Sequence, residues 1–502
     1  MSNLKSSKKR RNITLSVIFV SSVLLAGLIG NSFAQSGSTF TISSGVYPGA
    51  TDYTIDVDSG NYYAKNAYGA IAFSSSNASY VWNSVVTTLA TGTGGSIKTT
   101  CPMFEMTNPI VIIGGSSTPP SKTISIIGDG RWATVFKAMN AMNMFEVSNG
   151  ASVHMESFYI DMNGKNGYGI YGKNTGTSDR SFQKSVINDI EIRGVNAGYW
   201  AIYLENPYIT NTWDNLYVRS AGGGIYMECD SVGYGNNHFG NIMISLYGNN
   251  GVGLKLYRNG VAISLNSFDR VHIDGGAAGG STGNLGLELD GSNYNSFDYL
   301  EIEHCKYAVK MGATQSTHGN VIQSGYFYNM EADGVMFNMT TNAKNNIVRS
   351  VYCSALGGTN TLLLWDNNTD TSSPNSYYDL LGGNTGFLPQ NQYIVRAEDD
   401  ACLLYGSMLW RKAQNTIESS NFQINHTGVQ TLTITHALCL SPPLSSCHVQ
   451  IVQSTAVTDW DAHIIEVANL TETSVEVRLN VTSASATNPS YAKFGFYGNV
   501  NG

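Results

Sequence analysis

The sequence predicts an all-β protein: a right-handed, single-stranded parallel β-helix with an N-terminal capping helix and a small C-terminal antiparallel β-sandwich. Three observations predict it. An asparagine recurs every 25 to 29 residues, apolar residues stand at fixed positions after it, and the pattern changes to aperiodic alternation after about residue 415. Self-similarity at a period of roughly 20 to 50 residues is typical of solenoids, and a β-rich repeat of this length suits one coil of a parallel β-helix.

Each coil begins with an asparagine, and the six are Asn211, Asn237, Asn266, Asn295, Asn320 and Asn346. Two residues later stands a large apolar side chain in every coil: Trp213, Phe239, Phe268, Phe297, Ile322 or Val348. The positions five and seven after the asparagine are also mostly apolar, and they share one face of a strand because side chains alternate. We expect the asparagines to stack at a turn as a hydrogen-bonded ladder, each tolerating a left-handed backbone there.

Residues 1–34 have the features of a signal peptide. Basic residues between positions 5 and 11 precede an apolar run from Ile13 to Ile29, and small residues follow at Ser32 and Ala34. The run approaches the length of a membrane span, so the segment is either cleaved or retained as an N-terminal anchor. Both alternatives predict a secreted or cell-surface protein.

Residues 36–150 are expected to hold the N-terminal cap and the first coils. A helix is predicted over 77–90, where Val81, Val85 and Leu89 recur every four residues before Gly92. A Gly-Gly-Ser-Ile segment at 94–97 and an Ile-Ser-Ile-Ile-Gly-Asp-Gly strand at 124–130 follow it. This order resembles the N-terminal capping region of the pectate lyase superfamily, which implies a secreted β-helix protein of the polygalacturonase or tailspike kind that acts on polysaccharides.

Residues 151–412 are predicted to form the coil stack, and residues 413–502 a separate module. Alternating apolar segments at 431–435, 448–452, 474–479 and 493–497 lack the coil period, which favours a small antiparallel β-sandwich. The start of this region looks like the modules that follow β-helices in phage tailspike-like and cell-surface proteins. That resemblance implies a role in adhesion or in forming a homotrimer.

Composition narrows the partners. Only 13% of residues are charged and the formal net charge is −8, which argues against nucleic acid. No Cys-x-x-Cys motif or His/Cys cluster has the spacing of metal ligands, so the sequence predicts no zinc site. The partner that the resemblance to β-helix proteins implies is a polysaccharide or a surface glycan.

Candidate site residues come from two outward-pointing columns. They flank the apolar position that stands seven residues after each asparagine. The first outward column is Tyr159, Glu191, Tyr217, Met243, His272, Glu301, Tyr326 and Tyr352; the second is Asp161, Arg193, Arg219, Ser245, Asp274, Glu303, Tyr328 and Ser354. In a chain with few charges, such a stripe predicts a sugar-binding groove. The catalytic candidates are Asp274, Glu303, Glu301 and His272, and the substrate-binding candidates are Asp161, Arg193, Arg219, Tyr326 and Tyr328.

Asp274 and Glu303 are expected one coil apart, roughly 4.8 Å between strands. Two carboxylates at that separation either share a proton, as an acid beside a base or nucleophile in glycoside hydrolysis, or share a Ca²⁺. The Ca²⁺ arrangement with a nearby arginine resembles pectate lyase chemistry. A third interpretation is a solvated charge ladder without a site.

The chain departs from the enzymes it resembles. Polygalacturonases carry Asn-Thr-Asp, Asp-Asp, Gly-His-Gly and Arg-x-Lys motifs; here Asn-Thr-Asp is absent and the Asp-Asp pair stands at 399–400, near the end of the stack. The pectate lyase strings Trp-Ile-Asp-His and Arg-x-Pro-x-x-Arg are absent too. Two functions therefore stay open: a glycoside hydrolase or polysaccharide lyase, and a non-catalytic glycan-binding adhesin or tailspike-like fibre.

Overall fold

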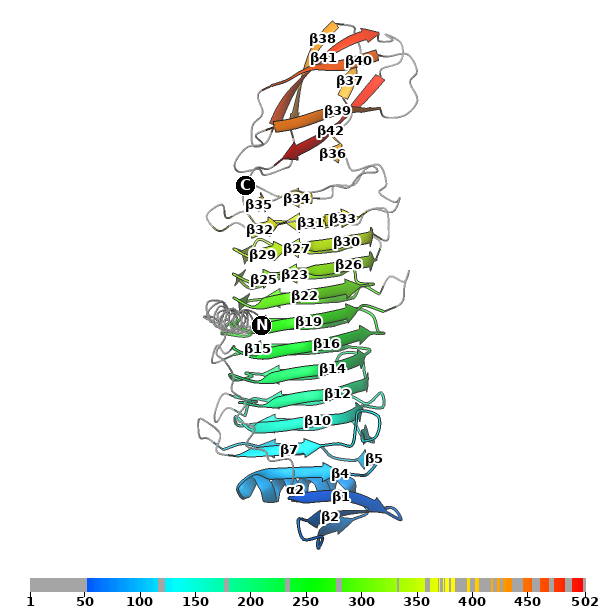
Figure 1. Ribbon diagram of the computed structural model, residues 1–502, viewed down its shortest axis with the longest axis vertical. Coiled ribbons are helices and arrows are strands. Elements are labelled where there is room, and N and C mark those ends of the chain that lie inside the picture. The colour runs from blue at the N-terminus through cyan, green and yellow to red at the C-terminus, as the bar shows by residue number, and fades with distance from the viewer. Residues whose placement is uncertain are drawn as a thin grey trace, which may run out of the picture. The chain divides into compact units, whose positions relative to one another are not determined.

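The computed structural model describes residues 52–115, 122–175, 180–230, 235–276, 282–331 and 334–356, shorter segments between 362 and 405, and strands in the C-terminal part. The predicted signal peptide, residues 1–34, lies outside the described residues. Within the described parts the chain is a stack of parallel β-coils, as predicted, and Figure 1 shows the coils as successive rungs.

Three parallel sheets form the sides of the stack. The long sheet contains β10 (Ser152–Asp161), β12 (Val186–Val195), β14 (Thr212–Ser220), β16 (His238–Leu246), β19 (Ser267–Asp274), β22 (Ser296–Glu303), β25 (Val321–Ile322), β26 (Gly325–Met330), β29 (Ile347–Arg349) and β30 (Val351–Leu356). The second sheet contains β9 (Phe145–Ser148), β11 (Ile170–Lys173), β13 (Trp200–Glu205), β15 (Gly223–Cys229), β17 (Val252–Arg258), β20 (Leu285–Asp290), β23 (Tyr307–Met311), β27 (Val335–Met339) and β31 (Leu362–Asp366). A short third sheet contains β18 (Ile263–Ser264), β21 (Ser292–Asn293), β24 (Thr317–His318) and β28 (Ala343–Lys344).

The N-terminal part supplies the first coils and a helix. Helix α2 (Ala78–Thr91) lies within one residue of the predicted segment, and the Asn77 side chain caps it by accepting from the Ser79 amide. Figure 1 shows α2 beside the first coils. The strands here are β1 (Tyr53–Asp58), β2 (Asn61–Asn66), β3 (Ile71–Ser75), β4 (Gly95–Thr99), β5 (Met103–Met106), β6 (Ile110–Ile113), β7 (Thr123–Ile127) and β8 (Val135–Ala138). The pairing of β1, β2 and β3 is antiparallel, an arrangement that the sequence pattern did not predict.

The C-terminal strands pair antiparallel, as predicted. They are β36 (Ile417–Glu418), β37 (Phe422–Ile424), β38 (Gly428–Thr435), β39 (Ser446–Gln453), β40 (Asp461–Ala468), β41 (Ser474–Ser483) and β42 (Ser490–Asn499). One sheet joins β36, β37 and β39 to β42, and another joins β38 and β40 to β41. The packing of these two sheets as a sandwich remains a prediction. Between the stack and this part, the long sheet adds β32 (Asn375–Tyr378), β33 (Leu381–Gly383) and β35 (Cys402–Tyr405), and the second sheet adds β34 (Val395–Ala397).

The asparagine ladder is confirmed. Each amide nitrogen donates to the side-chain oxygen of the next asparagine at 2.8 to 3.1 Å, from Asn211 through Asn346 and on to Asn375. Asn375 in turn donates to the buried carboxylate of Asp366. Since all of these side chains are buried, the ladder pairs donors and acceptors that would otherwise destabilise the core.

The backbone expectation for these asparagines is wrong. The left-handed residue is the one before each ladder asparagine: Thr210, Asn236, Leu265, Tyr294, Gly319 and Asn345, with φ of 54 to 68°. The turn therefore needs a left-handed residue first and an inward amide second. The asparagine is selected for its side chain alone, and the residue before it carries the backbone strain.

The core consists of the predicted apolar columns. Phe239, Phe268 and Phe297 are buried and stack with centroids 4.6 Å apart. The columns at five and seven residues after each asparagine are buried through the described coils, with Cys353 in the last of them as a free thiol. Such stacking repeats one side-chain layer per coil, so the outward columns are fixed in register by the inward ones.

Candidate functional site

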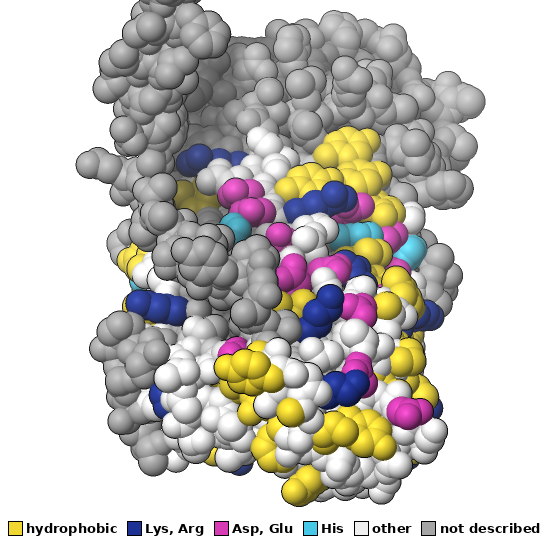
Figure 2. Space-filling view, turned by 60° about the horizontal axis from the view of Figure 1, so that its bottom comes forward, with side chains coloured by type: hydrophobic (Ala, Val, Ile, Leu, Met, Phe, Trp, Pro, Cys, Tyr) yellow, Lys and Arg dark blue, Asp and Glu magenta, His cyan; other side chains and the backbone are white. Residues whose placement is uncertain are grey.

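The two outward columns of the long sheet are aligned as predicted. Strand pairing places Tyr159, Glu191, Tyr217, Met243, His272, Glu301, Tyr326 and Tyr352 directly opposite one another from coil to coil. The same pairings align Asp161, Arg193, Arg219, Ser245, Asp274, Glu303, Tyr328 and Ser354. We call these two columns the outward face. Figure 2 shows acidic, basic and histidine side chains gathered among hydrophobic ones on the side of the molecule that it views.

Four side chains at the centre of this face interact with one another. His272 Nε2 lies 3.1 Å from Glu303 Oε1, and His304 Nδ1 lies 3.0 Å from Asp274 Oδ1 and 3.5 Å from Glu303 Oε2. The predicted pair of Asp274 and Glu303 is thus present with a histidine between its members. We call Asp274, Glu303, His304 and His272 the His–carboxylate cluster.

The central side chains are less accessible than the sequence predicts. His272, Asp274, Glu301 and Glu303 are only 14 to 29% exposed, because they pack on one another and on their neighbours. Glu301, a catalytic candidate, points to Arg270 at 3.6 Å and takes no part in the cluster. Each of the four still contributes polar atoms to the surface.

His304 is the member of the cluster that sequence reasoning missed. Strict alternation after Glu303 would turn the next side chain inward, but His304 adopts a left-handed backbone with φ 54°. The kink brings its ring to the same side as Glu303, while Cys305 becomes the buried residue. Burial raises the pKa of the Cys305 thiol well above its ordinary value, so this cysteine remains a protonated core residue.

Tyrosines border the cluster on its C-terminal side. Tyr326 stacks on Tyr328 with centroids 4.7 Å apart and on Tyr352 at 5.6 Å. Burial and a hydrogen bond to Glu303 raise the pKa of Tyr328, so its hydroxyl stays a donor. The predicted substrate-binding residues Tyr326 and Tyr328 therefore form one aromatic platform, and Tyr352, 42% exposed, extends it.

A second aromatic group borders the face on its N-terminal side. Trp132, in the turn before β8, is 67% exposed and lies under the guanidinium of Arg193, 4.8 Å from its ring centroid. Arg193 also lies over Tyr217 at 5.5 Å, and the Trp132 ring is 6.0 Å from that of Tyr159. Arg193 thus makes cation–π contacts with two of these rings, and Trp132 connects the third, Tyr159, to them.

Glu191 differs from its prediction. It occupies the outward column, but its side chain is completely buried and forms an ion pair with Arg193. Burial raises the pKa of Glu191, and its other oxygen has no partner within the described residues. Its ion pair with Arg193 fixes the position of that guanidinium on the outward face.

Asp161 and Arg219, two further substrate-binding candidates, have separate surroundings. Asp161 Oδ1 accepts from the Asn163 amide at 2.8 Å and so forms a turn at the end of β10. Burial and the charge of Asp161 raise the pKa of Tyr159 to about 12. Arg219 lies 5.8 Å from the ring centroid of Tyr247, which is 50% exposed and belongs to neither predicted column.

Sequence reasoning missed Trp132, Tyr247 and His304 for one shared reason: none of them occupies a position that the coil period defines. Trp132 lies in a turn and Tyr247 directly follows β16, both outside the two columns, and His304 lies in a kink that breaks strand alternation. Only their chemistry gave a signal: an aromatic residue beside a Gly-Asp-Gly turn, and a histidine directly after Glu-x-Glu.

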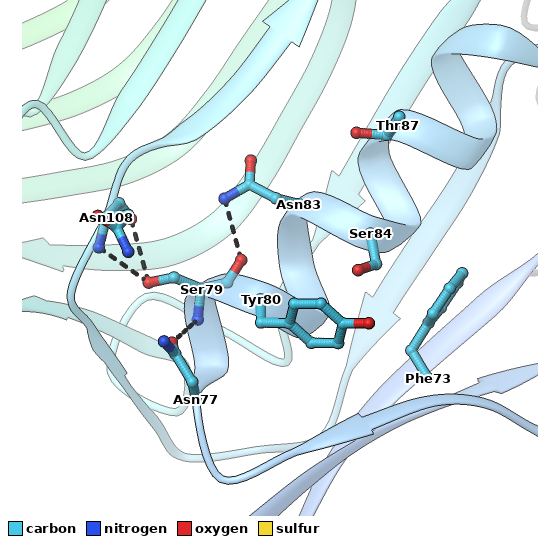
Figure 3. Close-up of a pocket in the computed structure, with 8 residues that line it drawn as sticks. All are labelled: Phe73, Asn77, Ser79, Tyr80, Asn83, Ser84, Thr87 and Asn108. Carbon is cyan, nitrogen blue, oxygen red and sulfur yellow. Dashed lines mark hydrogen bonds between the residues drawn. The ribbon is translucent and has the colours of Figure 1, made fainter.

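The N-terminal end also has a shallow pocket beside α2 (Figure 3), lined by Phe73, Asn77, Ser79, Tyr80, Asn83, Ser84, Thr87 and Asn108. No outward-face residue contributes to it.

Comparison with known proteins adds a fold likeness. No model of a protein family matches the chain, and no curated protein matches it. Among solved structures, the tailspike protein of E. coli bacteriophage HK620 in complex with a pentasaccharide is similar, with 9% identity and a TM-score of 0.41 over 84% of this chain and 90% of the tailspike. A variant of that tailspike, also with pentasaccharide, gives 8% identity and a TM-score of 0.43 over the same shares.

With TM-scores below 0.5, these likenesses support no inference about activity, which has to come from the chain's own residues. Within the described part of the chain, no helix has both the length and the apolar character needed to cross a membrane.

Proposed function

We propose that the outward face binds an extended polysaccharide and that the protein is a secreted or cell-surface glycan-binding protein. One observation carries this proposal: aromatic rings, guanidinium groups and carboxylates of neighbouring coils share two aligned columns, and the exposed rings of Trp132 and Tyr352 lie near the two ends of these columns. Flat apolar rings pack on the faces of sugar rings, and charged side chains bond the hydroxyl groups around them.

The length of the face favours a polymer over a single sugar. Arg193 and Glu303 belong to strands four coils apart, roughly 19 Å at the usual strand spacing. The aromatic groups at Trp132 and at Tyr352 lie on opposite sides of this interval. A chain of several sugars can contact both groups at once, whereas a monosaccharide contacts only one.

The first experiment identifies the glycan and locates its site together. A glycan array probed with the wild-type protein should give a restricted set of bound polysaccharides, and Trp132→Ala should weaken that binding by removing an exposed stacking surface. Tyr68→Ala is the matched control, because Tyr68 is 95% exposed in the turn between β2 and β3 and belongs to neither outward column. Equal loss in both variants, or no bound glycan at all, would contradict the proposal.

A second candidate function is cleavage of the bound glycan. Oxygens of Asp274 and Glu303 approach within 4.8 Å of each other, and a retaining glycosidase needs carboxyl groups about 5 to 5.5 Å apart. In this scheme one carboxyl protonates the departing oxygen while the other attacks or stabilises the sugar, and His272 orients Glu303.

The cleavage test uses the glycan found on the array. Asp274→Asn and Glu303→Gln should each abolish formation of reducing ends, with a melting temperature that is unchanged or higher because a like-charge contact is lost. Glu301→Gln is the matched control, since Glu301 pairs with Arg270 outside the cluster. Absorbance of unsaturated products distinguishes a lyase, and absence of any product leaves an adhesin or tailspike-like fibre. Homotrimer formation through residues 413–502 is part of that fibre proposal.

A further inference from the structure

We propose that Asp274, Glu303 and His304 form a binding site for a divalent transition-metal cation of the zinc class. The three residues offer one imidazole nitrogen and two carboxylate oxygens, all within 4.8 Å of one another. They come from the ends of β19 and β22, which pair as neighbouring strands. This inference does not depend on glycan binding.

The two distances from the imidazole nitrogen to the carboxylate oxygens suit one small cation. His304 Nδ1 lies 3.0 Å from Asp274 Oδ1 and 3.5 Å from Glu303 Oε2. Donor atoms on a tetrahedron about 2.0 to 2.1 Å from zinc lie roughly 3.3 Å apart. The two carboxylate oxygens lie within 4.8 Å of each other, so they have to approach when a cation binds between the three atoms, and a fourth position would stay open.

The backbone at His304 directs the imidazole toward the two carboxylates. In the corresponding kinks after Arg193 and Tyr328, the left-handed residues are Gly194 and Asn329, the two types that adopt this conformation most readily. Histidine at φ 54° costs on the order of 1 kcal/mol more than glycine would. Thr210, Leu265 and Tyr294 adopt similar angles in the coil turns, so the backbone at His304 accounts for the direction of its ring and the proposal depends on the donor atoms.

The charge of the cluster also favours a cation. Among the residues that the structure describes, no lysine or arginine forms an ion pair with Asp274 or Glu303. The nearby Arg270 pairs with Glu301. Two carboxylates within 4.8 Å repel each other unless a proton or a cation lies between them.

Neighbouring groups hold the proposed ligands in place. His272 contacts Glu303 Oε1, His304 lies nearer Oε2, and the Tyr328 hydroxyl also hydrogen-bonds this carboxylate. The Gly276 amide donates to Asp274 Oδ1 at 3.0 Å. Partners that orient ligating carboxylates in this way typically affect metal affinity 10- to 100-fold when they are removed, as a rough range.

The donor set distinguishes zinc-class cations from Ca²⁺. Ca²⁺ takes about six to eight oxygen ligands, and imidazole is not among them. Zinc and its neighbours accept imidazole and carboxylate together, with three protein ligands and one open position. The Ca²⁺ alternative raised by the Asp274 and Glu303 pair is thus the weaker one once His304 is included.

The test is a calorimetric titration of Zn²⁺ into the chelator-treated full chain, with Mn²⁺ and Ca²⁺ titrated separately. We expect one Zn²⁺ per chain, with binding at least tenfold weaker in His304→Asn and in Glu303→Gln. His304→Asn should keep the fold, since asparagine stands at the corresponding position 329. His272→Gln should weaken binding by a smaller factor.

Two matched controls exclude general surface binding. His318→Asn removes a histidine in β24 of the third sheet, and Glu301→Gln removes a carboxylate next to the cluster; both should bind Zn²⁺ like wild type. Absence of Zn²⁺ binding, equal Zn²⁺ binding in His304→Asn, or tighter binding of Ca²⁺ than of Zn²⁺ would overturn the proposal. In the first case the cluster is a hydrogen-bond network only.

Discussion

Individual residues of the turn determine how each coil closes. The residue before each ladder asparagine is left-handed, and glycine or asparagine fills that place at 236, 319 and 345. Leu265 is an exception: it has φ 59° and a side chain that is 56% exposed. Its apolar side chain gains little from burial while its backbone is strained.

Leu265→Asn should therefore stabilise the protein, by about 1 kcal/mol, because asparagine tolerates the left-handed conformation better than leucine. Urea denaturation measures this as a higher midpoint with unchanged slope. Leu265→Ala is the control. It also removes the leucine side chain, but alanine does not tolerate the left-handed backbone as asparagine does. A lower midpoint for Leu265→Asn than for Leu265→Ala would contradict the account of the turn.

Asp366, which accepts a hydrogen bond from the last asparagine of the ladder, makes the stability of the protein depend on pH. Its carboxylate is buried and accepts from Tyr377 and Asn375, yet burial raises its pKa to about 6. The ordinary unfolded value is roughly 3.9. Because the folded state binds this proton more tightly, the contribution to stability is full below about pH 4 and is lost as the pH rises through about 6, with an upper limit on the order of 3 kcal/mol.

Asp366→Asn removes this titration. We expect the difference in unfolding free energy between pH 5 and pH 7.5 to be smaller in the variant than in the wild type, measured by urea denaturation at both values. Other groups titrate in both proteins, so the comparison isolates residue 366. An identical pH dependence in the two proteins would show that Asp366 is not protonated in this window.

At the scale of the strand, sequence periodicity predicts the positions of strand residues but not those of residues in turns. The spacing of Asn211 to Asn346 places the outward residues of these six coils in their correct columns, because side-chain alternation transfers the register of the core to the surface. His304 and Trp132 escaped prediction since a backbone kink and a turn carry no period. The β1–β2 hairpin was also missed, although Ser59 and Gly60 form its left-handed turn.

The phenylalanine stack shows what holds a strand in register. Phe297 is completely buried and stacks on Phe268 at 4.6 Å. Phe297→Ala should lower the unfolding free energy by about 3 to 5 kcal/mol, because it leaves a cavity in a coil that neighbouring coils cannot close.

Met243→Ala is the control for Phe297→Ala, since Met243 is also a large apolar residue in the long sheet but is 38% exposed on the outward face. Its loss of unfolding free energy should stay below about 1 kcal/mol. A loss for Phe297→Ala as small as that of Met243→Ala would contradict the stacked core.

At the scale of the whole molecule, the fold supplies a long, rigid face and leaves its chemistry to a few side chains. Parallel β-helices stack identical coils, so an extended ligand meets the same geometry repeatedly. The aromatic groups and the His–carboxylate cluster are the places where this repetition is broken. Superfold membership alone assigns no activity, and these groups are what favours glycan binding here.

The most direct test of that central claim is the affinity for oligosaccharides of increasing length, prepared from the glycan that the array selects. Calorimetry should show affinity rising with each added sugar until the ligand reaches both Trp132 and Tyr352, and Tyr352→Ala should remove the gain of the longest ligands only. Affinity that is the same for the shortest and longest ligands, or that Tyr352→Ala leaves unchanged at every length, would contradict a binding face that runs along the coils.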